Sequence, residues 1–144
     1  MKKEIIRPIA ICLFQKDNTI LVSEGYDYVK EEFYYIPIGG GIEFGEKSSD
    51  TLIREVKEEL DADISNLQFL STIENIFTFN GDTAHEIVQI YDGEFVDKSL
   101  YNQSKLLIKE DNGQTHKATW KPLSDFQNGK LRLVPESLYN LLTK

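Results

Sequence analysis

The sequence predicts an α/β protein of the α+β type, in which helices flank a central mixed β-sheet. Strand-like segments precede and follow one amphipathic helix, and a short helix ends the chain. This order differs from the regular strand–helix alternation that builds an all-parallel sheet. The length of 144 residues suits one domain over residues 1–144, and a hydrophobic content of 40% is enough to fill its core.

Three strands are predicted before the long helix. Residues 5–14 are apolar on both alternating faces from Ile9 onward, which indicates a buried central strand. Residues 16–18 are typical of a turn, and residues 19–23 predict the strand that returns from it. The aromatic and β-branched segment 33–38 predicts the third strand, which leads directly into a run of glycines.

Four strands and a short helix are predicted after the long helix. The strands cover residues 69–79, 86–95, 106–109 and 118–121. The first two are joined through Asn80-Gly81, a dipeptide that favours hairpin turns. Pro135 suits the first turn of the final helix. The two long strands could also support a homodimer.

Charge and composition exclude several classes of protein. The net charge of −8, from 24 acidic and 16 basic side chains, argues against binding a nucleic-acid polymer through basic patches. No apolar run approaches the ~20 residues of a membrane-spanning helix, so no membrane partner is expected. The N-terminus lacks the apolar core of a signal peptide, and the single cysteine, Cys12, cannot form an internal disulfide. A cytoplasmic protein is therefore predicted.

The long helix is predicted over residues 48–60, which contain neither Gly nor Pro. At about 100° per residue, its apolar side chains gather on one side and three glutamates form a stripe beside them. The apolar residues are Leu52, Ile53, Val56 and Leu60, and the glutamates are Glu55, Glu58 and Glu59. Like charges one turn apart repel unless a cation lies between them. Divalent cations prefer such oxygen ligands, although a solvated acidic face would show the same pattern.

A glycine-rich segment lies directly upstream of this helix. It contains Gly39, Gly40, Gly41 and Gly45, four of the nine glycines in the chain. Glycine lets the backbone come close to a ligand or a metal ion. Such a loop is a weak signal by itself, but its fixed spacing from three glutamates is much more specific.

The spacing of these residues resembles the Nudix box of the Nudix hydrolases, G-x5-E-x7-R-E-U-x-E-E-x-G-U, with U an aliphatic residue. Gly40 is followed after five residues by Glu46, and after seven more by residues 54–62, REVKEELDA. Asp61 replaces the last glycine, and Asp tolerates the left-handed backbone that a helix C-cap requires. Residues 120–123, WKPL, resemble the tryptophan-proline-leucine segment that the family carries near its C-terminus.

The resemblance implies a Nudix-type α/β/α sandwich with a central mixed sheet. It also implies hydrolysis of a diphosphate linkage in a nucleoside diphosphate joined to another group. By position, Glu55, Glu58, Glu59 and the Gly40 carbonyl would bind divalent cations, Mg²⁺ with Mn²⁺ as a substitute. Glu46 and Arg54 are the box positions that orient the catalytic glutamates in the family, so the predicted catalytic residues are Glu46, Arg54, Glu58 and Glu59. Cations between clustered carboxylates would let them hold an anionic diphosphate.

The general base and the substrate contacts are less narrowly defined. Glu59 could deprotonate the attacking water, as could Glu110 or Asp111 on a later polar loop, or Glu86, which shares a strand face with Val88 and Ile90. Glu110 is also included among the predicted metal ligands. The predicted substrate contacts are Arg7 for a phosphate, and Tyr35 and Phe79 for stacking on a base.

Two other functions compete with the enzyme. A non-catalytic nucleotide sensor could use the same fold, although such binders usually lose carboxylates of the box and this chain keeps them. A plain interaction domain with an acidic helix would bind no divalent ion specifically. Zinc is not expected, because His85 and His116 are isolated from each other and from Cys12.

Overall fold

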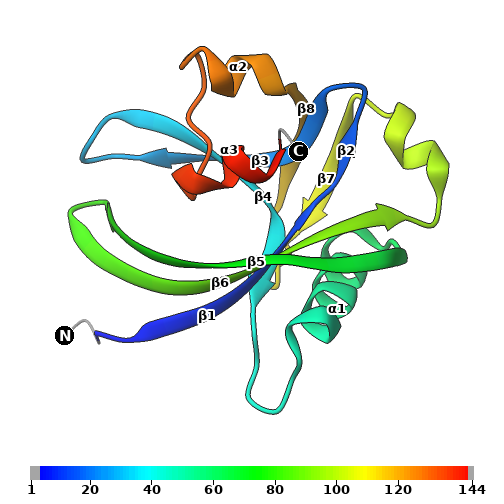
Figure 1. Ribbon diagram of the computed structural model, residues 1–144, viewed down its shortest axis with the longest axis horizontal. Helices are drawn as coiled ribbons and strands as arrows, with labels where there is room; N and C mark the ends of the chain where they lie inside the picture. Colours follow the sequence, from blue (N-terminus) through cyan, green and yellow to red (C-terminus); the bar gives the residue numbers. More distant parts are fainter. Residues whose placement is uncertain (1–3, 143–144) are drawn as a thin grey trace.

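A computed structural model describes residues 4–142 and confirms the mixed sheet with flanking helices (Figure 1). The strands are β1 (Ile6–Leu13), β2 (Gln15–Lys16), β3 (Thr19–Asp27), β4 (Glu32–Gly41), β5 (Ile64–Phe79), β6 (Asp82–Phe95), β7 (Lys105–Lys109) and β8 (Thr115–Pro122). The helices are α1 (Ser48–Leu60), α2 (Leu123–Gln127) and α3 (Tyr139–Leu142), with 3-10 turns η1 (Lys98–Asn102) and η2 (Glu136–Leu138).

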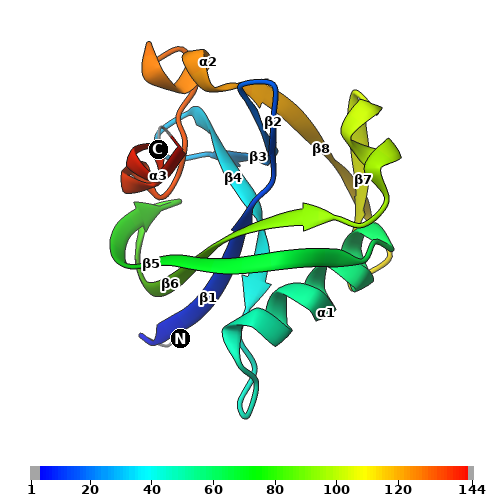
Figure 2. The same cartoon turned by 45° about the vertical axis from the view of Figure 1, so that its right-hand side comes forward.

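The sheet has the strand order β5-β6-β1-β4-β3-β8-β7, and β2 pairs with β3. Strand β1 is parallel to β6 and antiparallel to β4, so the sheet is mixed. The first half of β4 pairs with β3, whereas residues 38–41 pair with β1. Strand β6 stays paired with β1 along its length, whereas the β3–β4 hairpin separates from β1 (Figures 1 and 2).

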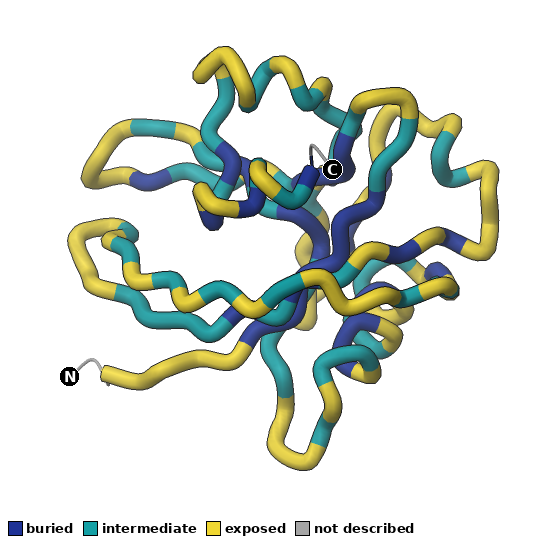
Figure 3. Tube along the Cα trace, in the orientation of Figure 1, coloured by how far each residue is buried: buried dark blue, intermediate teal, exposed yellow. Residues whose placement is uncertain are grey.

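Two hydrophobic clusters lie on the two faces of the central strands. Ala10 and Cys12 of β1 pack in the cluster that includes α1, whereas Ile9 and Ile11 pack in the cluster beneath α2 and α3. Figure 3 shows the buried residues concentrated along β1 and its neighbours, with exposed hairpin tips. This alternation confirms that β1 is buried on both faces, as its unbroken apolar run predicts.

The predicted helix over residues 48–60 is confirmed, and the main differences are in the strands and short turns. Strands β3, β5, β6 and β8 are longer than predicted because their exposed ends carry polar side chains, which hide the alternating pattern. The sequence reasoning missed η1 and α2, which are each only 5 residues long. Pro135 precedes η2, which leads directly into α3.

Hydrogen bonds join the tip of the β3–β4 hairpin to the tip of the β5–β6 hairpin. Asp27 accepts hydrogen bonds from the backbone N–H groups of Val29 and Lys30, both at 2.9 Å, and from that of Asn80 at 3.2 Å. The Asn80 side chain accepts one from the Tyr28 N–H at 2.8 Å. These contacts join segments that are about fifty residues apart. Within residues 4–142, no helix is long and apolar enough to cross a membrane.

Candidate active site

Helix α1 packs against β1, β4 and β7 through most of the apolar face that the sequence predicts, including Leu52, Val56 and Leu60. Thr51, Leu52 and Val56 are buried, whereas Ile53 is 50% exposed. The prediction that Ile53 faces the sheet is therefore wrong. The buried face is rotated toward Glu55, whose side chain is only 16% exposed. Glu55 thus points at the sheet instead of lying beside the apolar stripe.

Two glycines of β4 make room for this arrangement. A Cβ atom on Gly40 would lie 2.4 Å from the carboxyl carbon of Glu55, and one on Gly39 would lie 2.0 Å from the Ala10 carbonyl oxygen. Both distances are shorter than real Cβ contacts. Gly39 must be glycine because the obstacle is backbone, whereas a Cβ on Gly40 would force the Glu55 side chain to move. The absence of a side chain at Gly40 thus leaves room for the Glu55 carboxylate beside the end of β4.

Arg54 connects the glutamates to the glycine segment. Its Nε and Nη2 atoms donate to the two carboxylate oxygens of Glu46, at 2.8 and 3.0 Å. Its Nη1 donates to Glu55 at 2.9 Å and to Glu58 at 3.4 Å, and Nη2 also donates to the Gly41 carbonyl at 3.2 Å. The Arg54 guanidinium, helped by the Thr51 hydroxyl, lowers the pKa of Glu46 to about 2. Arg54 Nη1 also lies 3.3 Å from a Glu43 carboxylate oxygen, so one cation pairs with four carboxylates.

Glu59 lies among other acidic groups. Burial, together with the hydrogen bond and charge of Glu55 and the charges of Glu110 and Asp111, raises the pKa of Glu59 to about 9. Glu110 and Asp111 follow β7, which packs on α1, so the tertiary fold brings the β7–β8 loop to this helix. Glu110 is also paired with His116 Nδ1 at 2.8 Å. Around Glu59, three further carboxylates, of Glu55, Glu110 and Asp111, lie close together, and Arg54 is paired with the first of them.

Helix α1 ends where the family spacing places its last glycine. Asp61 adopts the left-handed conformation, with φ 52° and ψ 42°, and its N–H donates to the Lys57 carbonyl. The prediction that Asp61 can cap the helix is confirmed. The substitution at this position leaves the charged residues of the helix in place.

The side chains fit a divalent cation in chemistry, although not in their present rotamers. In the chain from residue 4 to residue 142, no three His, Cys, Asp or Glu side chains are close enough together to hold an ion. Arg54 holds Glu55 and Glu58, whose oxygens would be ligands. The donors are all oxygen atoms, which suit Mg²⁺ or Mn²⁺.

A wide groove lies on the opposite face, between the β5–β6 hairpin, β1, β4 and the residues around Pro135. Its volume is about 1460 Å³, and Arg7, Tyr34, Phe79 and Glu86 are among the residues that line it. Tyr34 and Phe79 meet edge to face, with ring centroids 5.6 Å apart. Arg7 and Phe79, two of the predicted substrate contacts, therefore share this groove.

Tyr35 and Glu86 do not lie where their predicted roles require. Tyr35 is 6% exposed, packs against Phe126 of α2 and donates its hydroxyl hydrogen to Glu24. Its neighbour Tyr34 lines the groove instead. The alternating pattern of β4 does not tell which of its two faces borders a groove, so it could not predict this. Glu86 faces the groove and not α1, so it lies away from Glu59 and does not fit the role of general base.

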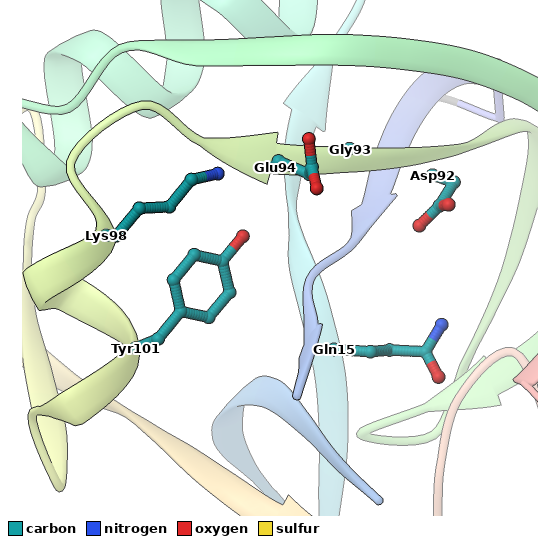
Figure 4. A pocket seen from close by; sticks show the side chains of 6 residues that line it. All are labelled: Gln15, Asp92, Gly93, Glu94, Lys98 and Tyr101. Carbon is teal, nitrogen blue, oxygen red and sulfur yellow. The ribbon is translucent and has the colours of Figure 1, made fainter. Parts of the chain in front are cut away.

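A smaller cavity of about 480 Å³ lies beside the bend between β1 and β2 (Figure 4). It is lined by Gln15, Asp92, Gly93, Glu94, Lys98 and Tyr101. Tyr101 and Glu94 already make hydrogen bonds, to the Phe95 N–H and to Asn66 respectively. Neither the glutamates of α1 nor the groove residues contribute to it.

The site is consistent with what comparison with known proteins finds. A sequence model of the NUDIX domain matches residues 5–142. The chain belongs to the Nudix family. A MutT Nudix hydrolase from Burkholderia pseudomallei has a similar fold, with a TM-score of 0.62 and 19% identity over 84% of this chain and 86% of that chain. A Nudix hydrolase from Clostridium perfringens gives a TM-score of 0.63 at 16% identity, over 95% and 93% of the two chains.

Membership of the Nudix family confirms the family prediction and identifies the chain as an enzyme, a Nudix pyrophosphohydrolase. Nudix hydrolases act on small nucleoside diphosphate derivatives and generally use a divalent metal ion. The structural neighbours, all below 25% identity, support the fold alone.

Proposed function

We propose that this Nudix enzyme hydrolyses the diphosphate linkage of a nucleotide derivative with Mg²⁺, for which Mn²⁺ can substitute. The observation that supports this most is the close approach of Gly40 to Glu55, with Arg54 fixing that carboxylate from the other side. A buried carboxylate held against a side-chain-free backbone suits a cation that needs both carboxylate and carbonyl oxygens.

The cation would be held by Glu55, Glu58 and Glu59 with the Gly40 carbonyl, and by Glu110 from the β7–β8 loop. When bound, it neutralises charge on the diphosphate and acidifies a coordinated water. Glu46 and Arg54 act as positioning residues, because Arg54 bonds Glu55 while Glu46 holds Arg54 by two hydrogen bonds. Arg54 also anchors the Gly41 carbonyl, which keeps the end of β4 beside the helix.

Glu59 is our choice for the general base. It lies in the interior of the cluster, and Glu110 and Asp111 approach it from the facing loop. A raised pKa makes a carboxylate a stronger proton acceptor once it is ionised. Glu110 is the second candidate, since its pairing with His116 gives it a route for passing on a proton.

The nucleoside would occupy the groove on the other side of β4. Tyr34 and Phe79 offer aromatic surface for a base, and Arg7 offers a cation for a phosphate. Arg7 Nη2 would lie 3.7 Å from a Cβ atom on Gly41, the residue at which β4 ends. A nucleotide could therefore pass from the groove around this end to the glutamates.

The test is turnover of a panel of substrates with Mg²⁺ or Mn²⁺: dinucleoside polyphosphates, nucleoside triphosphates, nucleotide sugars and NADH. Hydrolysis at a diphosphate linkage that stops in EDTA supports the proposal. Binding of a nucleotide without product would favour the nucleotide sensor instead. If calorimetry shows no specific binding of a divalent ion, the chain is better explained as an interaction domain.

A cytoplasmic location and a homodimer are part of the same proposal. Cys12 is a buried free thiol whose pKa is raised by burial and by Asp92, which fits a reducing compartment. Strand β5 ends the strand order and carries exposed Phe69, Leu70 and Ile76. Light scattering over a range of concentrations tests the dimer, and cell fractionation tests the location.

A further inference from the structure

Three polar side chains form one row across the floor of the groove. Arg7 of β1 pairs in register with Glu86 of β6, and Glu86 pairs in register with Asn75 of β5. Residues paired in this way point to the same face of a sheet, and all three line the groove. Arg7, Glu86 and Asn75 are called the polar row below.

Apolar side chains border the polar row on both sides. The row toward the core consists of Ile9, Val88 and Ile73, which belong to or pack against the buried cluster under α3. The row toward the hairpin tip contains Phe77, paired with Ala84. A ligand that lies flat on this floor can therefore make its polar contacts along one line.

Glu86 is the charged acceptor of the row, and its side chain is mostly buried. It is 13% exposed, and its carboxylate is 3.7 Å from Arg7 Nη1, beyond hydrogen-bond distance. Among the described residues 4–142, no group donates a hydrogen bond to it. Burial raises the pKa of Glu86, against the opposing effect of Arg7. A mostly buried carboxylate of this kind favours a ligand that brings hydrogen-bond donors.

We propose that the polar row makes this enzyme selective for guanine nucleotides, an inference that rests on the proposed function. Guanine presents its ring N1–H and its exocyclic amino group side by side, and a carboxylate accepts two such parallel bonds. The adjacent O6 atom is an acceptor, and Arg7 lies beside Glu86 to donate to it. Adenine, cytosine and uracil do not offer two neighbouring donor atoms on this edge.

The place of the polar row suits a base whose phosphates reach the glutamates. Arg7 lies next to Gly41, and Gly40 lies against Glu55 on the other face of β4. Tyr34 and Phe79 stand at the wall of the same groove, where they can cover an aromatic ring. The base would thus bind on one side of the end of β4, and the diphosphate would be hydrolysed on the other side.

The experiment measures binding of GMP, IMP and AMP to the whole chain by calorimetry in EDTA. These monophosphates have no diphosphate linkage, so neither turnover nor a metal affects the result. IMP differs from GMP only in lacking the exocyclic amino group. We expect GMP to bind at least about tenfold more tightly than IMP, because with IMP the Glu86 carboxylate loses the hydrogen bond from the exocyclic amino group.

Glu86→Gln should reduce the preference for GMP over IMP to within about threefold, because the amide presents a donor to the amino group. Glu94→Gln is the matched control on the same strand, since Glu94 is exposed and lies outside the groove, and it should keep the full preference. Arg7→Gln should weaken GMP and IMP by the same factor and AMP by less, because GMP and IMP lose the contact to O6 as well as any contact to the phosphate.

Equal binding of the three monophosphates, no binding of any of them, or a preference that survives Glu86→Gln would overturn the inference. The outcome is separable from that of the proposed function. Hydrolysis of nucleotides without guanine preference contradicts only the inference. Selective GMP binding by a protein that hydrolyses no nucleotide contradicts only the proposed function.

Discussion

The two faces of the sheet carry candidate residues of different origin. On the α1 side, Glu46, Arg54 and Glu55 come from one stretch of chain and are joined by short hydrogen bonds. On the groove side, Arg7 and Glu86 come from strands far apart in sequence and are only loosely paired. The charges of the first region are already paired with one another before any ligand arrives, whereas Arg7 and Glu86 are 3.7 Å apart, beyond hydrogen-bond distance. We expect the first to govern the chemistry and the second to govern the choice of substrate.

The largest effect is expected from removing a charge on the α1 side. Glu58→Gln or Glu59→Gln should lower the turnover number by about a hundredfold or more, because each amide would replace a predicted cation ligand. The thermal midpoint should change little. Asp50→Asn is the control, since Asp50 is an exposed carboxylate in the first turn of the same helix. Full activity in both glutamate variants would remove the metal role from α1.

A smaller effect is expected from filling the space beside Glu55. Gly40→Ala would place a Cβ atom 2.4 Å from the Glu55 carboxyl carbon, so the helix must shift or the side chain must move. We expect a loss of about 1–3 kcal/mol in the free energy of unfolding, together with reduced activity. Gly41→Ala is the matched control, because its Cβ would lie in ordinary van der Waals contact, 3.7 Å from Arg7 Nη2. Denaturant unfolding of both variants compares them, and equal losses would contradict the close approach.

The α1 side should also depend on acid in a specific way. The folded pKa of Glu46 is lowered from 4.5 to about 2, so its contribution to stability is present above about pH 4.5 and is lost as the pH falls toward 2. Glu46→Gln should remove this part of the acid sensitivity. Urea midpoints between pH 2 and 6 for the wild type and the variant measure the difference. Glu31→Gln, at an exposed position, should follow the wild type.

The smallest effect is expected at the hairpin tips that close the groove side. Asn80→Gly removes the acceptor for the Tyr28 N–H but keeps a residue that tolerates φ 50°. We expect a loss of about 0.5–1 kcal/mol and faster hydrogen exchange at Tyr28. Asn18→Gly is the control, since Asn18 has φ 62° in the β2–β3 turn and its side chain makes no such bond. An equal loss in the two variants would show that the tie between the hairpins contributes nothing.

Much of the fold was predictable because its signals are local. Residues 48–60 form the helix as predicted, and Asn80-Gly81 forms a turn in which both residues have positive φ. The two groups of the site that were misplaced, Ile53 and Tyr35, depend on contacts between distant segments. Ile53 is 50% exposed, while Glu55 approaches Gly40 of β4, and Tyr35 is buried and packs against Phe126 of α2. Neither contact can be predicted from the order of polar and apolar residues along the local sequence.

The sequence by itself determined which charged residues share the helix and how they are spaced, because helical periodicity depends only on neighbours along the chain. Only the tertiary structure decided that Glu55 lies against Gly40 of β4, that Glu110 and Asp111 of the β7–β8 loop lie near Glu59, and that Arg7, Glu86 and Asn75 align. Strand pairing and register arise from contacts between segments that are remote in sequence, so the alignment of these side chains exists only after the sheet has formed.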